Sequence, residues 1–218
     1  MKRIISLVCA TAVCTLFSMQ ALGATCGAYL GLGVGKSWVK LPKGQLFTPP
    51  TGGRASSSFS GLGARGFFGF NLNKYFGLEA GYTHYDRALY SGSFPGQYSA
   101  LTYYIHTYDF VAKGYFPFGN TGFNLYALGG IARVVESVQF INGGISANSN
   151  VAFPANDGTT HGYNNRPIYG LGANYNFGAH FTINAEITQV QKLNSFSNTP
   201  YAVPFLDLAT VNVAYNFG

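Results

Sequence analysis

The chain has 218 residues, of which 47% are hydrophobic, 17% are aromatic and only 9% are charged, with a formal net charge of +6. Disordered chains need many charges and few aromatic residues, and soluble helical bundles are rich in Ala, Glu, Lys and Leu, so this composition disfavours both. The 29 glycines and 16 tyrosines favour an all-β protein, and the length suits one domain.

The first 24 residues are predicted to be a secretory signal peptide that is removed from the fold. Two basic residues precede an apolar stretch at 4–17, which is shorter than the ~20 residues of a membrane helix. Small and polar residues follow, so cleavage is expected after Gly23 or Ala24. The chain is therefore expected to be exported.

The remaining residues, 25–218, are predicted to form one membrane domain without helices. Cys26 is the only cysteine left after cleavage, so no intrachain disulfide can form. No apolar run after the signal reaches the ~18 to 20 residues that a membrane helix needs. A membrane-spanning chain of this kind must be a closed β-barrel, because only a barrel then satisfies every backbone hydrogen-bonding group.

Eight segments alternate with a period of two residues, and each is long enough to cross a bilayer as a tilted strand of ~9 to 11 residues. In chain order the predicted strands are 27–37, 58–70, 76–86, 103–116, 123–137, 167–177, 181–191 and 205–217. Short connections alternate with the long ones, which are 38–57, 87–102, 138–166 and 192–204. This asymmetry is typical of an antiparallel up-and-down outer-membrane barrel, with short periplasmic turns and four long extracellular loops.

The two faces of the predicted strands decide between a membrane barrel and a soluble one. In the segment 181–191, Ile183 and Ile187 share one face, whereas Asn184 and Glu186 share the other. An eight-stranded barrel has an interior just wide enough for side chains, which suits the small and polar face. We therefore predict that the large apolar face contacts lipid, with a soluble barrel or sandwich as the alternative.

The inner face is predicted to hold charged residues of both signs in equal number. These are Arg65, Glu79, Asp109, Lys113, Arg133 and Glu186. Buried charges are tolerated when they are paired and hydrogen-bonded, so the balance predicts a salt-bridged plug. The alternative is a proton or ion pathway lined by the same groups. Asp109 and Arg133 lie on the two segments whose faces are least clear.

Four segments resemble the strand and turn patterns of OmpA-type eight-stranded barrels and of related opacity-type surface antigens. They are FGLEAGY at 76–82, FPFG at 116–119, YALGG at 126–130 and YGLGA at 169–173. The last strand also resembles the C-terminal signal that the barrel-assembly machinery reads, with Val213, Tyr215 and Phe217 in the alternate positions and Gly218 after the aromatic residue.

The resemblance implies a Gram-negative outer-membrane protein whose partners are outer-membrane lipids, lipopolysaccharide and the assembly machinery. OmpA itself carries a peptidoglycan-binding domain after its barrel. The present chain stops at the eighth predicted strand, so that function is not expected here.

Three functions remain open: a structural and surface-interaction barrel, a small pore, and a lipid A-modifying enzyme. The first is favoured, as an adhesin or surface antigen that contacts a host or cell-surface ligand. The expected contact residues are the apolar ones of the third long loop, Phe140, Ile141, Ile145, Val151 and Phe153.

The sequence does not favour catalysis, a metal or a cofactor. His84 and His106 flank the second long loop, which contains Ser91, Ser93 and Ser99, but no motif of a barrel deacylase is present. No His and Cys cluster has the spacing of a metal site, and no Lys and Arg cluster indicates nucleic-acid binding. We therefore expect a non-enzymatic protein without cofactors.

Overall fold

The computed structural model describes residues 26–40, 54–58, 60–94, 97–119, 121–142, 158–191 and 205–217. These residues form ten strands and no helix, and so contain no helix that could cross a membrane. The strands are β1 (Gly27–Lys40), β2 (Arg54–Ser58), β3 (Ser60–Asn71), β4 (Phe76–His84), β5 (Ala88–Phe94), β6 (Gln97–Pro117), β7 (Phe123–Asn142), β8 (Gly158–Phe177), β9 (Phe181–Val190) and β10 (Phe205–Asn216). The predicted signal peptide lies outside the described residues.

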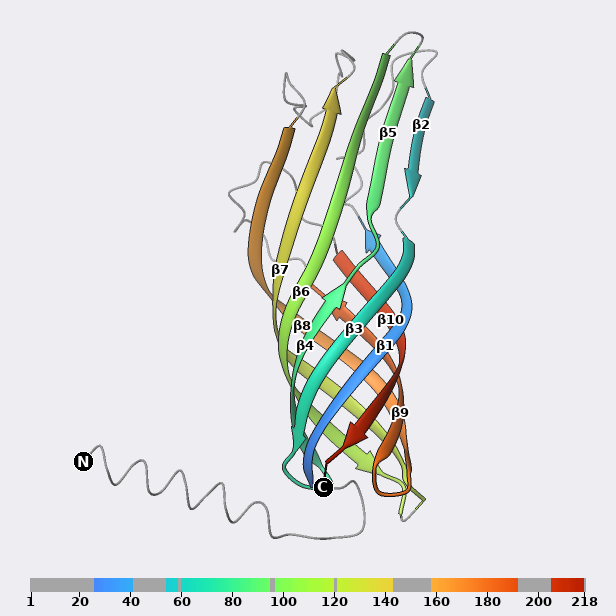
Figure 1. Cartoon of the computed structure of the whole chain (residues 1–218), viewed down its shortest axis with the longest axis vertical. Helices are drawn as coiled ribbons and strands as arrows, with labels where there is room; N and C mark the ends of the chain where they lie inside the picture. The colour runs from blue at the N-terminus through green and yellow to red at the C-terminus, as the bar shows by residue number, and fades with distance from the viewer. Residues whose placement is uncertain are drawn as a thin grey trace, which may run out of the picture.

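The strands close into a ring through antiparallel pairing (Figure 1). β1 pairs with β3 on one side and with β10 on the other, so the first and last strands meet. β6 pairs with β7, which completes the ring. β2 pairs with β5, and β5 pairs with β6. β2 precedes β3 and β5 follows β4, so the two short strands continue β3 and β4 beyond the ring. The predicted closed eight-stranded antiparallel barrel is confirmed.

One side of the barrel rises well above the other (Figure 1). β6, β7 and β8 have 21, 20 and 20 residues, whereas β4 and β9 have 9 and 10. We call the extension the raised wall; it comprises β2, β5 and the residues 97–105, 131–142 and 158–167.

The predicted loop limits at 87–102 and 138–166 are therefore wrong, because much of each is strand. These segments contain many Ser, Gly, Thr and Asn residues, and their sequence does not alternate as that of lipid-crossing strands does. The backbone hydrogen-bond ladder needs no such alternation and continues into them.

Exposure alternates along the strands with the apolar side chains outward. In β9, Thr182, Asn184 and Glu186 are buried inside, whereas Ile183 and Ile187 are exposed. On other strands Leu32 and Leu171 expose 73% and 69% of their surface. Such a belt of large exposed apolar side chains suits lipid and not water. The inside-out orientation predicted from the sequence is confirmed.

Glycines on the inner face make room for aromatic rings in the narrow interior. A Cβ added at Gly31 would lie 2.2 Å from Cζ of Phe67, and one at Gly69 would lie 2.2 Å from Cζ of Tyr29. Tyr29 and Phe67 pack edge to face, with ring centroids 6.1 Å apart. The small residues seen in the sequence thus alternate with large ones across the interior.

The short connections lie together at one end of the barrel, which we call the turn end; the opposite end is the loop end (Figure 1). Between β3 and β4, the side chain of Asn73 accepts hydrogen bonds from the backbone N–H groups of Tyr75 and Phe76 at 2.8 and 2.9 Å. Between β8 and β9, Gly178 has a φ of 63°, a conformation that glycine adopts without strain.

Candidate functional site

Five charged side chains from four strands converge in the middle of the barrel. They are Arg65 on β3, Glu79 on β4, Asp109 and Lys113 on β6, and Glu186 on β9. Each exposes 5% or less of its surface. The inward alternation of the strands brings them together although they are spread over more than 120 residues of sequence. We call these five residues the lumen network.

Arg65 holds the loop-end half of the lumen network. Its guanidinium donates two hydrogen bonds to Asp109, at 3.1 and 2.8 Å, and one to Glu79 at 3.0 Å. Gly81 lies directly opposite Asp109, and a Cβ there would be 2.7 Å from Nη2 of Arg65. The missing side chain at Gly81 therefore lets the guanidinium reach across the strand to its partner.

Lys113 holds the turn-end half of the lumen network. Its Nζ lies 2.7 Å from Glu79 and 3.2 Å from Glu186. The hydroxyl of Tyr29 donates to Glu79 at 2.9 Å, and that of Tyr126 donates to Glu186 at 2.8 Å. Two cations are thus linked to three carboxylates by direct contacts.

The structure places Arg133 elsewhere, so its assignment to the inner face is wrong. Arg133 is on the outer face of β7, with its guanidinium 4.5 Å from the ring centroid of Tyr163. The inner face of β7 instead carries the buried Glu136, and Arg166 is buried on the neighbouring β8. The segment was ambiguous because β7 has apolar residues on both faces. The polar Asn124 at its turn end, which is buried, would have indicated that even-numbered residues point inward.

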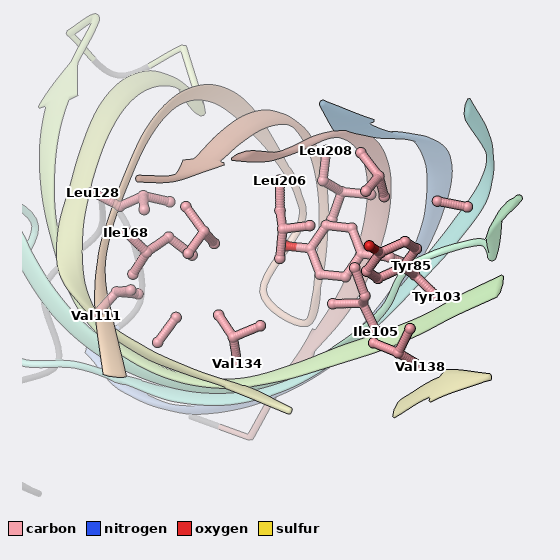
Figure 2. Close-up of a cluster of buried hydrophobic side chains, with 14 of the residues drawn as sticks. Tyr85, Tyr103, Ile105, Val111, Leu128, Val134, Val138, Ile168, Leu206 and Leu208 are labelled. Atoms are coloured by element: carbon pink, nitrogen blue, oxygen red, sulfur yellow. The ribbon is translucent and has the colours of Figure 1, made fainter. Parts of the chain in front are cut away.

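A layer of apolar side chains that the sequence pattern does not reveal lies between the lumen network and the loop end. Figure 2 shows Tyr85, Tyr103, Ile105, Leu206 and Leu208 gathered inside the ring of strands. None of these five exposes more than 4% of its surface. We call this cluster the apolar layer, and it closes the interior a second time.

Below the lumen network, toward the turn end, the interior opens into a small polar recess of about 20 Å³. Lys113 and three tyrosines border it, and its other walls are mostly asparagine and threonine side chains. They are Asn71, Asn174, Asn176, Thr182, Asn184 and Asn216. Going from turn end to loop end, the interior is therefore polar, then ionic, then apolar.

The predicted loop contacts are described only in part. Ile141 lies near the loop end of β7 and is 50% exposed. Phe140 is part of the same strand, and Ile145, Val151 and Phe153 lie outside the described residues. The predicted assembly residues Val213, Tyr215 and Phe217 lie on the outer face of the closing strand β10 and just beyond it, exposed at the turn end.

The residues considered for catalysis or metal binding lie toward the loop end of β4, β5 and β6. His84 ends β4 and His106 lies opposite it on β6, while Ser91 and Ser93 are on β5 and Ser99 is on β6. Within the part of the chain that the structure describes, no three His, Cys, Asp or Glu side chains gather in a group that could hold a metal.

Comparisons with known proteins agree with this geometry. The family described as "Outer membrane protein beta-barrel domain" matches residues 9–217. An uncharacterized protein of Coxiella burnetii is 27% identical over 177 residues, which are 72% of this chain and 68% of that protein.

Among solved structures, the outer membrane protein OprG of Pseudomonas aeruginosa is similar, with a TM-score of 0.54, 12% identity, and coverage of 90% of this chain and 100% of OprG. Ail, the attachment invasion locus protein of Yersinia pestis, is also similar, with a TM-score of 0.49, 16% identity, and coverage of 88% and 99%. The likeness to OprG shows a shared barrel fold.

Proposed function

The chain belongs to the outer membrane protein beta-barrel domain family, and from this premise we propose a non-enzymatic role in surface interaction. The protein is a Gram-negative outer-membrane barrel with the loop end facing the cell exterior. We propose that it is exported by its signal peptide and assembled through Val213, Tyr215 and Phe217. Its outer belt then contacts outer-membrane lipids and lipopolysaccharide.

The raised wall is the observation that carries the proposal. A strand needs ~9 to 11 residues to cross a bilayer, whereas β6 has 21. Tyr163 lies 14 residues from the turn end of β8 (Phe177), which corresponds to roughly 35 Å along the membrane normal at 3.3 Å per residue and a tilt near 40°. The apolar band of a barrel is only about 25 Å tall. The part of the raised wall at the height of Tyr163 and beyond therefore stands outside the lipid.

The outer face of the raised wall has the composition of a contact surface. Tyr104, Ile141 and Tyr163 are exposed, and Arg133 lies against the ring of Tyr163. Aromatic residues and arginine contribute most to protein interfaces, and a rigid sheet loses little entropy on binding. We propose that this face, together with the loops that it supports, contacts a ligand on a host or neighbouring cell.

A pore is the less favoured function because two layers close the interior. The lumen network fills the middle of the barrel, and the apolar layer closes it above. We propose that the protein does not conduct ions. We also propose that it does not modify lipid A, which mass spectrometry of lipid A from expressing cells would test.

Adhesion of bacteria that display the protein tests the proposed role. Cells expressing the unaltered chain should adhere to cultured epithelial cells more than cells with an empty vector. The double variant Tyr104→Ser, Tyr163→Ser should lose most of this adhesion. The matched control Tyr75→Ser removes an exposed tyrosine at the turn end and should adhere normally. Equal adhesion by all three proteins, or none above the vector, would contradict the proposal.

A further inference from the structure

Two histidines that are 22 residues apart in sequence face each other on the outer surface. His84 on β4 and His106 on β6 are direct partners in the antiparallel register. Both side chains lie on the outer face; His84 is exposed and His106 is half-buried. The proposed surface role uses neither of them.

The hydrogen bonding of the backbone sets how near the two side chains can come. The N–H of Tyr85 donates to the carbonyl of Ile105 at 3.1 Å, so that adjacent pair is the hydrogen-bonded one. Paired positions alternate in an antiparallel ladder, so His84 and His106 occupy a non-hydrogen-bonded position. At such positions the Cα atoms are about 4.5 Å apart and the side chains are closest.

This spacing suits a metal ion held between two imidazoles. A tetrahedral ion with metal–nitrogen distances of ~2.0–2.1 Å requires two nitrogens about 3.3 Å apart. Two imidazole rings whose Cβ atoms are ~4.5–5.5 Å apart can bring one nitrogen each to that separation.

Aromatic neighbours restrict one ring of the pair. Tyr82 and Tyr108 form the next pair toward the turn end, with ring centroids 5.3 Å apart. The ring of His106 packs against both, at 5.9 Å from Tyr82 and 5.8 Å from Tyr108. On the neighbouring strand β3, the residue opposite His84 is the small Ala64, which leaves space for the exposed imidazole ring of His84 to turn.

The pair lies where the lipid-facing belt ends. Along β4 from the turn end, the outward residues before His84 are Phe76, Leu78, Ala80 and Tyr82. His84 is the next outward residue and is the first with a nitrogen that can bind a metal. Lys36 on β1 is the first cation above a similar apolar stretch. His84 lies eight residues from Phe76, roughly 20 Å along the membrane normal, so the pair is near the loop-end border of the ~25 Å apolar band, where ions of the headgroup region reach an exposed side chain.

We propose that His84 and His106 bind one divalent transition-metal ion of the class that prefers imidazole, which comprises Cu²⁺, Ni²⁺ and Zn²⁺. Two ring nitrogens bind the ion, and water fills the other positions. Ca²⁺ and Mg²⁺ require oxygen ligands and do not bind at this pair. The site is open, because two protein ligands leave coordination positions for exchangeable donors.

Binding of Cu²⁺ to the untagged protein in detergent micelles tests the proposal. The Cys26→Ser background removes the thiol, which otherwise binds or reduces copper. Electron paramagnetic resonance at one equivalent of Cu²⁺ should show coupling to two nitrogens. His84→Asn and His106→Asn should each weaken Cu²⁺ binding by at least roughly 10–100-fold. Mutating a residue that only hydrogen-bonds a metal ligand already costs that much affinity, and here a ligand itself is lost. The control His161→Asn, His180→Asn removes the other two histidines and should bind as the background does.

A chemical measurement on the unmutated histidines gives an independent result. Diethyl pyrocarbonate modifies accessible imidazoles, and mass spectrometry locates the adducts. Cu²⁺ should protect His84 and His106 and leave His161 and His180 reactive. Unchanged binding in either single variant, loss of binding in the control, or absence of protection would overturn the proposal.

Discussion

Replacing the buried Lys113 by Met should destabilise the barrel far more than replacing the exposed Lys74 by Met. Met keeps most of the side-chain volume but removes the charge that contacts Glu79 at 2.7 Å and Glu186 at 3.2 Å. Both carboxylates then stay buried with fewer partners. Removing one member of a buried ion pair costs about 3–5 kcal/mol. With a slope of about 2 kcal/mol per molar urea, the unfolding midpoint should fall by roughly 2 M.

A double-mutant cycle identifies charge as the cause. Glu79→Gln removes one of the anions that Lys113 stabilises, so the double variant should recover part of the loss, with a coupling energy of about 1–3 kcal/mol. Lys74→Met is the matched control, because Lys74 is exposed at the turn end, and should change stability by less than about 0.5 kcal/mol.

The assay for the cycle is urea unfolding of the barrel in lipid vesicles, followed by the loss of the fast-migrating band on unboiled gels. A Lys113→Met variant as stable as the Lys74→Met control would refute the argument that the lumen network stabilises the barrel. Additive effects of the two substitutions would show that Lys113 and Glu79 do not interact.

Three further predictions concern the lipid-facing belt, the interior and the signal peptide. Leu32→Arg, on the outer face of β1, should destabilise the barrel in vesicles by about 2–4 kcal/mol, whereas Lys36→Arg should not; equal midpoints would contradict the lipid-facing assignment. Leu206→Ala should cost roughly 2–5 kcal/mol but leave planar bilayers non-conducting, because the lumen network still closes the interior; steady channels would contradict closure by two layers. N-terminal sequencing of the exported protein should begin at Ala24 or Thr25, and retention of Met1 would contradict cleavage.

The part of the fold that contacts lipid could be predicted from the sequence because two solvents act on its strands. Lipid selects large apolar residues such as Ile183 and Ile187 outside, and the narrow interior selects Asn184 and Glu186 inside. This alternation predicted the eight strands of the barrel and the outward orientation of their apolar faces. It also assigned the five residues of the lumen network to the inner face, but together with Arg133, which lies outside, and it could not show which cation contacts which carboxylate.

The raised wall and the apolar layer could not be predicted because that alternation is lost there. On β6 and β10 the interior positions Ile105 and Leu206 are as apolar as outward positions, so the two faces look alike. On β7 the same ambiguity led to Arg133 being assigned inside in place of Glu136. Above the lipid, β5 pairs through its backbone, and its Ser and Gly residues carry no periodic signal.

The described strands form a closed barrel whose apolar face points outward, toward lipid. The most direct test is to express the full chain in a Gram-negative host and to run its membrane fractions on SDS gels with and without boiling. We predict a mature-length band in the outer membrane that migrates faster when unboiled, because a closed barrel resists the detergent. A soluble periplasmic product without a heat-dependent shift would contradict the inside-out barrel.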